Sequence, residues 1–221
     1  MLITTLQLRC GVTMGSLVSF LENDLTATTG MTADKQQPVT SVGVIAGGFK
    51  PFHQGHWMLV QKALSENAGG VFLFVSTDSR SRPGEFEITG PRMTSVWDTI
   101  LIPALASYNI KVELTKTPVL SVYELLRTKT VGEGVTYNIY ADKNDAVKNY
   151  PGNRMAKNNP ELFAAGMIKV VGVGRFADGI SGTKMRLALQ LGLREDFIEG
   201  LPDIVRSQGD RIWQLLGGDT V

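Results

Sequence analysis

The feature that most constrains the fold is an apolar, β-branched run that leads directly into a glycine-containing loop. The run is residues 42–46 (VGVIA), and the loop is residues 47–56 (GGFKPFHQGH). An amphipathic stretch follows, with Trp57, Val60 and Leu64 at helical spacing. This order predicts a strand, a tight loop and a helix that extends over residues 56–67.

The same alternation continues along the chain. Residues 142–165 are polar and broken by Pro151, Gly152 and Pro160. Elsewhere the pattern predicts strands at residues 42–46, 71–76, 111–114, 137–140 and 168–173, and helices at residues 56–67, 89–107, 121–128 and 182–191, with a helical C-terminus to about residue 216. Alternating strands and helices predict an α/β fold: a Rossmann-like doubly wound parallel sheet of about five strands with right-handed crossovers. Ligands of such sheets bind beyond the carboxyl ends of the strands.

Residues 1–40 differ in character from the rest of the chain. Residues 15–25 carry Leu17, Val18, Leu21 and Leu25 at the spacing of a short helix, and residues 26–40 are rich in Thr, Gln, Asp and Gly. We expect a leader and linker over residues 1–40 and a single folded domain over residues 41–221.

Composition excludes several classes of protein. The 221 residues include 22 basic and 21 acidic side chains, for a net charge of +1, without the basic patch of a nucleic-acid-binding surface. Cys10 is the only cysteine, which excludes disulfide scaffolds and cysteine-based metal sites. No stretch reaches the roughly 18 apolar residues of a membrane span, and no signal peptide is recognisable. We therefore expect a cytoplasmic protein with no nucleic-acid or membrane partner.

The loop carries the only two histidines of the chain. His53 and His56 lie on either side of Gly55, where the helix begins, so both imidazoles can face one point. The free N–H groups and the dipole of a helix N-terminus favour a phosphate there, and glycines at positions 47 and 48 allow a ligand to approach the backbone closely. A metal site is the alternative, but carboxylates alone would have to complete it, so we expect none.

A second strand–loop–helix junction lies near the C-terminus. Residues 180–186 read ISGTKMR, and Ser181 or Thr183 can cap the following helix. The free N–H groups of that helix suit the β- and γ-phosphates of a nucleotide. Arg186, one turn into the helix, can point back along the same face and bind phosphate bidentately.

Together the two segments resemble the nucleotidyltransferase superfamily that carries the HxGH and ISxTxxR signatures, also called cytidylyltransferase-like. The first signature, G-x-F-x-P-x-H-x-G-H, is matched by Gly47, Phe49, Pro51, His53, Gly55 and His56. The second is matched by Ile180, Ser181, Thr183 and Arg186. The resemblance covers residues 42 to about 205, although the middle is matched only by architecture.

The resemblance implies transfer of a nucleoside monophosphate group to a small phosphorylated acceptor, with release of pyrophosphate. It implies catalytic roles for His53, His56 and Arg186, with Mg²⁺ bound through the triphosphate of the co-substrate, and Lys50 in the same loop is a further candidate for a catalytic role. The nucleotide-binding residues that it implies are Gly47, Gly48, Phe49, Gly55, Ser181, Gly182, Thr183 and Asp142. The Ser-Gly-Thr form of the second motif is similar to that of adenylyltransferases, and nicotinamide-nucleotide adenylyltransferases look most similar, so ATP is the expected co-substrate.

Several alternatives stay open. The chain departs from the family at Gly48, where members often carry Ser, Thr or Arg, and at Lys50, which is either a phosphate ligand or a solvated loop lysine. Arg92 and Trp97 are candidate acceptor-binding residues, and a surface arginine and a core tryptophan are the competing interpretations. CTP is the alternative co-substrate, and a non-catalytic nucleotide-binding or assembly module is the alternative function. Such a module, or the enzyme itself, could form a homo-oligomer.

Overall fold

Five parallel strands form one sheet in the computed structural model, which describes residues 40–174 and 179–218. The strand order is β3-β2-β1-β4-β5, with β1 in the middle. In the register, Val44 of β1 lies between Phe72 of β2 and Ile139 of β4. The strands are β1 (Thr40–Gly47), β2 (Val71–Ser76), β3 (Ile110–Thr115), β4 (Val135–Asp142) and β5 (Ile168–Val173). The prediction of a Rossmann-like parallel sheet is confirmed, whereas the expectation for residues 1–39 lies outside the described residues.

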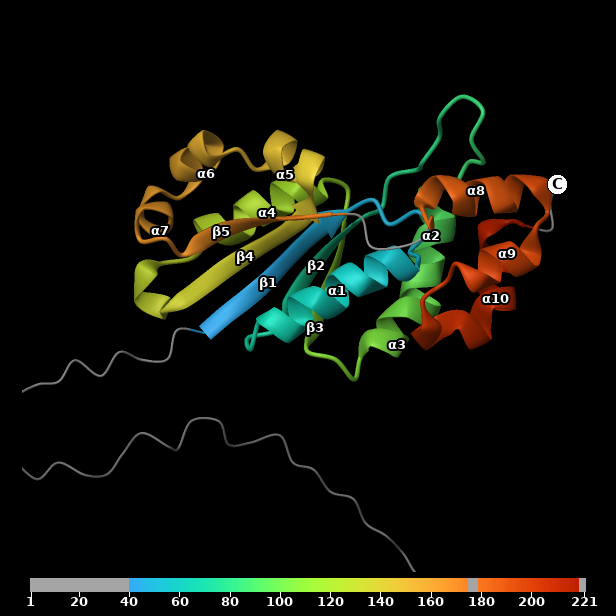
Figure 1. The fold of residues 1–221 in the computed structure, drawn as a ribbon, viewed down its shortest axis with the longest axis horizontal. Coiled ribbons are helices and arrows are strands. Elements are labelled where there is room, and N and C mark those ends of the chain that lie inside the picture. The colour runs from blue at the N-terminus through green and yellow to red at the C-terminus, as the bar shows by residue number, and fades with distance from the viewer. Residues whose placement is uncertain (1–39, 175–178, 219–221) are drawn as a thin grey trace, which may run out of the picture. The chain divides into compact units, whose positions relative to one another are not determined.

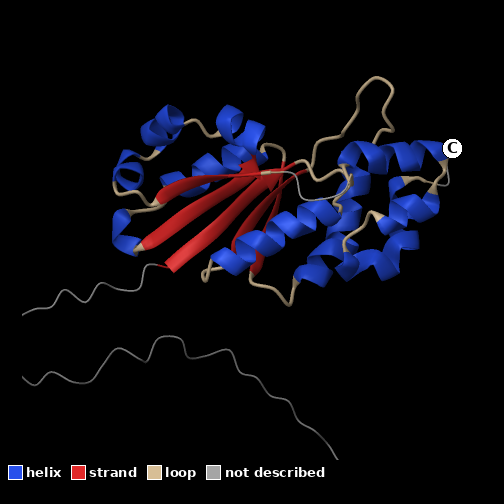
Figure 2. Ribbon diagram, in the orientation of Figure 1, coloured by secondary structure: helices blue, strands red, loops and turns tan. Residues whose placement is uncertain are grey.

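Helices cover both faces of the sheet (Figure 2). On one side, a hydrophobic core joins the sheet to α1 (Gln54–Glu66), α2 (Gly90–Val96) and α3 (Ile102–Leu105), and it continues beyond the end of the sheet into α8 (Gly182–Leu191), α9 (Arg194–Glu199) and α10 (Gly209–Leu216). The other face packs against α4 (Pro118–Arg127), α5 (Lys143–Asn149), α6 (Gly152–Asn158) and α7 (Pro160–Ala164). Successive residues of a strand are buried alternately in the hydrophobic cores on the two faces of the sheet, as Val44 and Ile45 of β1 are. Because both faces are covered, the strands read as nearly continuous apolar runs.

Two segments differ from the prediction. Residues 142–165, which read as polar and broken, form the three short helices α5, α6 and α7, since Pro151 and Pro160 stand at helix starts rather than in helix interiors. The single helix predicted over residues 89–107 is divided by a π-helical turn, η1 (Trp97–Leu101). Pro103 follows this turn and cannot donate the backbone hydrogen bond of a regular α-helix, which accounts for the interruption.

The C-terminal helices pack beside the start of α1 and beside α2, at the end of the sheet where β1 stops (Figure 1). The Gln54 N–H donates to the Gly200 carbonyl at 3.0 Å, and the Phe197 and Trp213 rings meet edge to face inside this helical layer. The second sequence motif is thereby brought against the first. Among the described residues, no helix combines the length and the apolar character required for a membrane span.

Candidate active site

The loop between β1 and α1 is held in a strained conformation by aromatic packing. Phe49 has a φ of 46°, in the left-handed region that non-glycine residues seldom adopt. Its ring contacts those of Phe52 and Trp97 at centroid distances of 5.8 and 6.3 Å. A Cβ on Gly47 would lie 2.9 Å from this ring. Strain of this kind persists only where surrounding packing imposes it, and such strain is concentrated at functional sites.

The two loop glycines therefore serve different purposes. Gly47 makes room for the Phe49 ring and lines neither of the two cavities described below, so its expected contact with a nucleotide is not supported. Gly48 is exposed, and a Cβ added there would meet no atom within 4 Å. It lies at the wall of the second cavity. A side chain at position 48 would thus enter open space beside a possible ligand.

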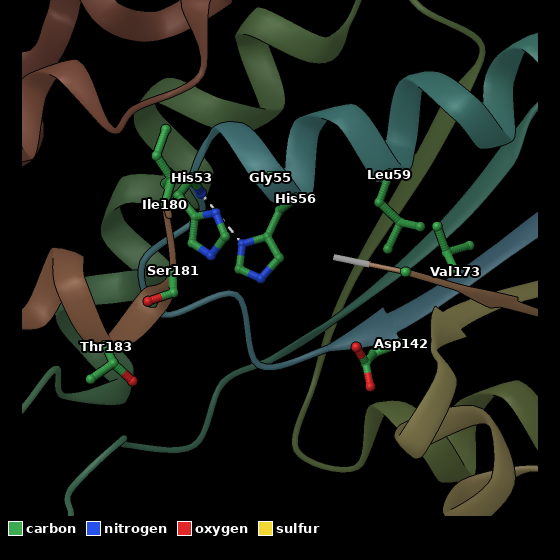
Figure 3. Close-up of a pocket in the computed structure, with 11 residues that line it drawn as sticks. His53, Gly55, His56, Leu59, Asp142, Val173, Ile180, Ser181 and Thr183 are labelled. Carbon is green, nitrogen blue, oxygen red and sulfur yellow. Dashed lines mark hydrogen bonds between the residues drawn. The ribbon is translucent and has the colours of Figure 1, made fainter. Parts of the chain in front are cut away.

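The two imidazoles stack at the N-terminus of α1. The centroids of the His53 and His56 rings are 3.7 Å apart, with 26° between their planes, and Figure 3 shows the rings side by side at the wall of a pocket. The backbone N–H of His53 donates to Nδ1 of His56 at 3.3 Å. When neutral, His56 then carries its proton on Nε2, which leaves an N–H donor for a ligand. Nδ1 of His53 is buried without a partner among the described residues.

Burial keeps both histidines neutral at physiological pH. It lowers the pKa of His53 to about 4, with a smaller contribution from the positive charge of Arg186. Burial also holds the pKa of His56 well below its ordinary value of 6.5, with His53 contributing further. The site therefore offers neutral N–H donors at these positions rather than imidazolium cations.

The second motif begins α8, as the sequence predicts. The Ser181 hydroxyl accepts a hydrogen bond from the Lys184 N–H at 3.3 Å and so caps the helix. A Cβ on Gly182 would lie 2.9 Å from Nη1 of Arg186, so a side chain at position 182 would displace that guanidinium from its present position. Ser181, Gly182 and Thr183 line the same pocket as the histidines.

Arg186 is buried and bonded to three parts of the protein. Its Nε donates to Oε2 of Glu85 at 2.9 Å, Nη1 to the Lys50 carbonyl at 2.8 Å and Nη2 to the Thr183 hydroxyl at 3.2 Å. These three protein contacts were not expected from the sequence, which indicated only a phosphate-binding role for Arg186. Arg186 joins both motifs to the loop between β2 and α2, and one N–H on each Nη atom is left for a ligand.

Two cavities meet at this point. The first, of about 290 Å³, is lined by both histidines, by Gly55 and Leu59 of α1, by Asp142, Val173 and Gly174 at the ends of β4 and β5, and by residues 180–183. The second, of about 650 Å³, is lined by Gly48, Phe49, Lys50, His56, Ser76, Asp78, Ser79, Arg80, Arg82, Asp145, Gly182, Thr183 and Arg186. His56, Gly182 and Thr183 belong to both walls, so a reacting group placed there is reached from either side.

The second cavity is rich in cations. Lys50, Arg80, Arg82 and Arg186 line it, against the two carboxylates of Asp78 and Asp145. Burial lowers the pKa of Lys50, whereas the negative charge of Asp78 acts in the opposite direction. Such a wall suits an anionic group of a substrate. Lys50 therefore lies at a cavity wall rather than in solvent. This position is compatible with a phosphate ligand and not with a solvated loop lysine.

The two tentative acceptor residues lie elsewhere. Trp97 is fully buried and packs edge to face on Phe52 at 5.2 Å, so it supports the loop and cannot stack on a substrate. Nη1 of Arg92 donates to the Leu216 carbonyl at 3.2 Å and thus fastens α2 to α10. Neither residue lines either cavity, so the structure does not support their assignment as acceptor-binding residues.

Sequence reasoning missed the residues of the β2–α2 loop. Arg80, Arg82 and Glu85 lie in a segment that reads only as a polar loop. A signal was present, since the two arginines lie four and six residues after the carboxyl end of a buried strand, where ligands of parallel sheets bind. Leu59 was absent from the candidates because it reads as an ordinary helical core position.

No protein-family model matches this chain, and no curated protein matches it. The solved structures that resemble it distantly include the following two. Nicotinic acid mononucleotide adenylyltransferase of Plasmodium falciparum, complexed with APC, is 10% identical over 80% of this chain and 98% of its own, with a TM-score of 0.46. TmcAL of Thermotoga maritima, bound with alpha-thio ATP, is 13% identical over 78% of this chain and 55% of its own, also with a TM-score of 0.46.

Proposed function

We propose that this protein is a nucleotidyltransferase, which moves AMP from ATP to a small phosphorylated acceptor and releases pyrophosphate. The observation that carries the proposal is the meeting of two cavities at His56, Gly182 and Thr183, one suited to a nucleotide and the other lined by cations. A transfer reaction between two substrates requires this arrangement, because the donor and acceptor phosphates must approach each other in line.

The nucleotide occupies the first cavity in this proposal. Leu59, Val173 and Ile180 supply apolar contacts for the base, and the carboxylate of Asp142 can accept hydrogen bonds from ribose hydroxyls. The triphosphate then lies between the N-termini of α1 and α8, where unpaired N–H groups attract anions. ATP is favoured by the Ser-Gly-Thr form of the second motif, and CTP is the alternative co-substrate.

The acceptor phosphate occupies the second cavity, where Lys50, Arg80 and Arg82 face it. One of its oxygens attacks the α-phosphorus, the bond from that phosphorus to the bridging oxygen of the β-phosphate breaks, and pyrophosphate leaves with the bond electrons. The neutral His56 donates its Nε2 hydrogen to an α-phosphate oxygen, on which negative charge grows in the transition state. No covalent bond to the protein is formed.

Mg²⁺ fits the proposal as an ion carried by the nucleotide. No group of three or more His, Cys, Asp or Glu side chains that could hold a metal is formed within residues 40–174 and 179–218. The phosphates would therefore supply most of the ligands, with Asp78 and Asp145 as the carboxylates at the wall of the cationic cavity. When bound, the ion neutralises part of the triphosphate charge.

The test is release of pyrophosphate from each of the four ribonucleoside triphosphates with Mg²⁺ and a panel of phosphorylated acceptors. We expect release only with an acceptor present, and fastest with ATP. His56→Ala is the inactive control. Binding of ATP without pyrophosphate release from any acceptor in the panel would contradict the proposal and favour the non-catalytic binding module.

A further inference from the structure

The carboxylate that binds Arg186 comes from a distant part of the chain. Glu85 lies on the loop between β2 and α2, which projects beside α8 (Figure 1). Its Oε2 accepts from Nε of Arg186 at 2.9 Å and also lies 3.4 Å from Nε of Arg80. One oxygen thus serves two arginines, both of which line the cationic cavity. The hydrogen bond from Arg186, together with the positive charges of Arg186 and Arg80, lowers the pKa of Glu85, so the side chain is an anion at neutral pH.

We propose that Glu85 is an internal competitor of the nucleotide phosphates for Arg186, and that phosphate binding displaces it. This inference rests on the proposed function, since it assigns the phosphates to the neighbourhood of Arg186. A phosphate bound bidentately by a guanidinium uses two parallel N–H groups, often those of Nε and one Nη. Glu85 now occupies Nε, so that geometry becomes available only when the carboxylate leaves.

Glu85 has a second partner to which it can move. Arg80 is already within 3.4 Å, so a rotation of the Glu85 side chain keeps the carboxylate paired without a change in the loop backbone. The base of the loop is fixed, because Arg80 and Ile88 exchange backbone hydrogen bonds of 2.8 and 3.1 Å and Ile88 is fully buried. The carboxylate thus has two positions within one fixed loop.

The alternative is that Glu85 positions Arg186 for phosphate and remains in place. The two roles predict opposite results. Removal of a competitor strengthens phosphate binding, whereas removal of a positioning group weakens it, because a guanidinium with an unfixed plane loses more entropy when it binds. Whether removal of the Glu85 carboxylate strengthens or weakens phosphate binding therefore distinguishes the competing role from the positioning role.

The chain offers a matched control two residues away. Glu87 lies on the same loop, is exposed, and makes no hydrogen bond or ion pair with the described residues. Glu87→Gln removes the same charge from the same loop without touching Arg186. Glu85→Gln keeps the shape of the side chain and removes its charge. Glu85→Asp keeps the charge but shortens the side chain by one methylene, which withdraws the carboxylate from Arg186.

The experiment is calorimetric titration of the full chain and the three variants with ATP, inorganic tripolyphosphate and adenosine, after thermal unfolding has shown that each variant is folded. We expect Glu85→Gln and Glu85→Asp to bind ATP and tripolyphosphate about fivefold or more tightly, as the loss of a competing charged hydrogen bond requires. Glu87→Gln should stay within about twofold of the unmodified chain, and adenosine should bind all four proteins alike.

Weaker or unchanged phosphate binding by the Glu85 variants would overturn the inference, as would an equal gain from Glu87→Gln. Failure of every protein to bind tripolyphosphate would also overturn it, since Glu85 would then compete with nothing. The outcome is separable from that of the proposed function. Tighter binding without any pyrophosphate release refutes the transferase alone, and pyrophosphate release without tighter binding refutes the competitor alone.

Discussion

Protonation of His53 should destabilise the fold between pH 6.5 and 4. Burial lowers the pKa of this side chain from 6.5 to about 4. The unfolded chain therefore binds more protons than the folded protein between these values, so the free energy of unfolding falls as the pH is lowered through this window. Each pKa unit corresponds to about 1.4 kcal/mol, so the free energy of unfolding should fall by about 3 kcal/mol in total. About 2 kcal/mol of this loss is reached by pH 5.

The perturbation that isolates this effect is His53→Gln, which removes the titrating group and keeps a polar side chain of similar length. Chemical denaturation of both proteins at pH 7.5 and pH 5 gives the free energies of unfolding. Between these pH values we expect the unmodified protein to lose about 2 kcal/mol more than the variant. Carboxylates with lowered pKa values, such as that of Glu85, affect both proteins and cancel in the difference. Equal losses in the two proteins would refute the argument that burial holds His53 neutral.

Three further predictions follow from the site. His56→Ala should lower kcat by about 100-fold or more with KM for the nucleotide within a few-fold, because its N–H acts on charge that grows in the transition state; a kcat near that of the unmodified enzyme would remove it from the mechanism. Arg186→Ala should weaken binding of the nucleoside triphosphate much more than binding of the monophosphate, and calorimetry that shows both weakened equally would contradict the phosphate role. The same variant should lower the free energy of unfolding by about 2 kcal/mol, because the buried Lys50 carbonyl loses its hydrogen-bond donor. A protein that begins at Pro38 should fold and release pyrophosphate at the full rate per site, because β1 starts at Thr40; insolubility or inactivity would show that the preceding segment belongs to the core or the site.

Local patterns in the sequence were sufficient to predict the elements that position the site. The apolar run before Gly47 and the run before residue 180 each form a strand of one parallel sheet, as β1 and β5. Carboxyl ends of parallel strands meet at one edge of a sheet, so the two motifs had to converge there. Pro151 and Pro160 misled the interpretation because proline breaks a helix interior but also starts a helix, and the sequence alone does not distinguish these positions.

Contacts between distant segments could not be predicted in this way. Glu85 and Arg186 are separated by 101 positions, and no local pattern encodes their pairing. Trp97 has the amphipathic character of a possible ligand-stacking residue, and only its tertiary neighbours Phe49 and Phe52 show that it supports the loop. The sequence likewise indicates no partner for Arg92, and only the structure shows that it donates a hydrogen bond to the Leu216 carbonyl.

Neutral histidines, which burial favours, also fit the arrangement of charge around them. Lys50 and Arg186 already supply fixed positive charge on the cationic side of the site. An imidazolium at position 53 would repel Arg186 and would require a buried anion of its own, which the described residues do not place beside it. Neutral imidazoles avoid this repulsion and still present N–H donors to a phosphate oxygen. The cations can therefore bind substrate charge that is present throughout the reaction, while the histidines respond to the charge that develops at the α-phosphate during it.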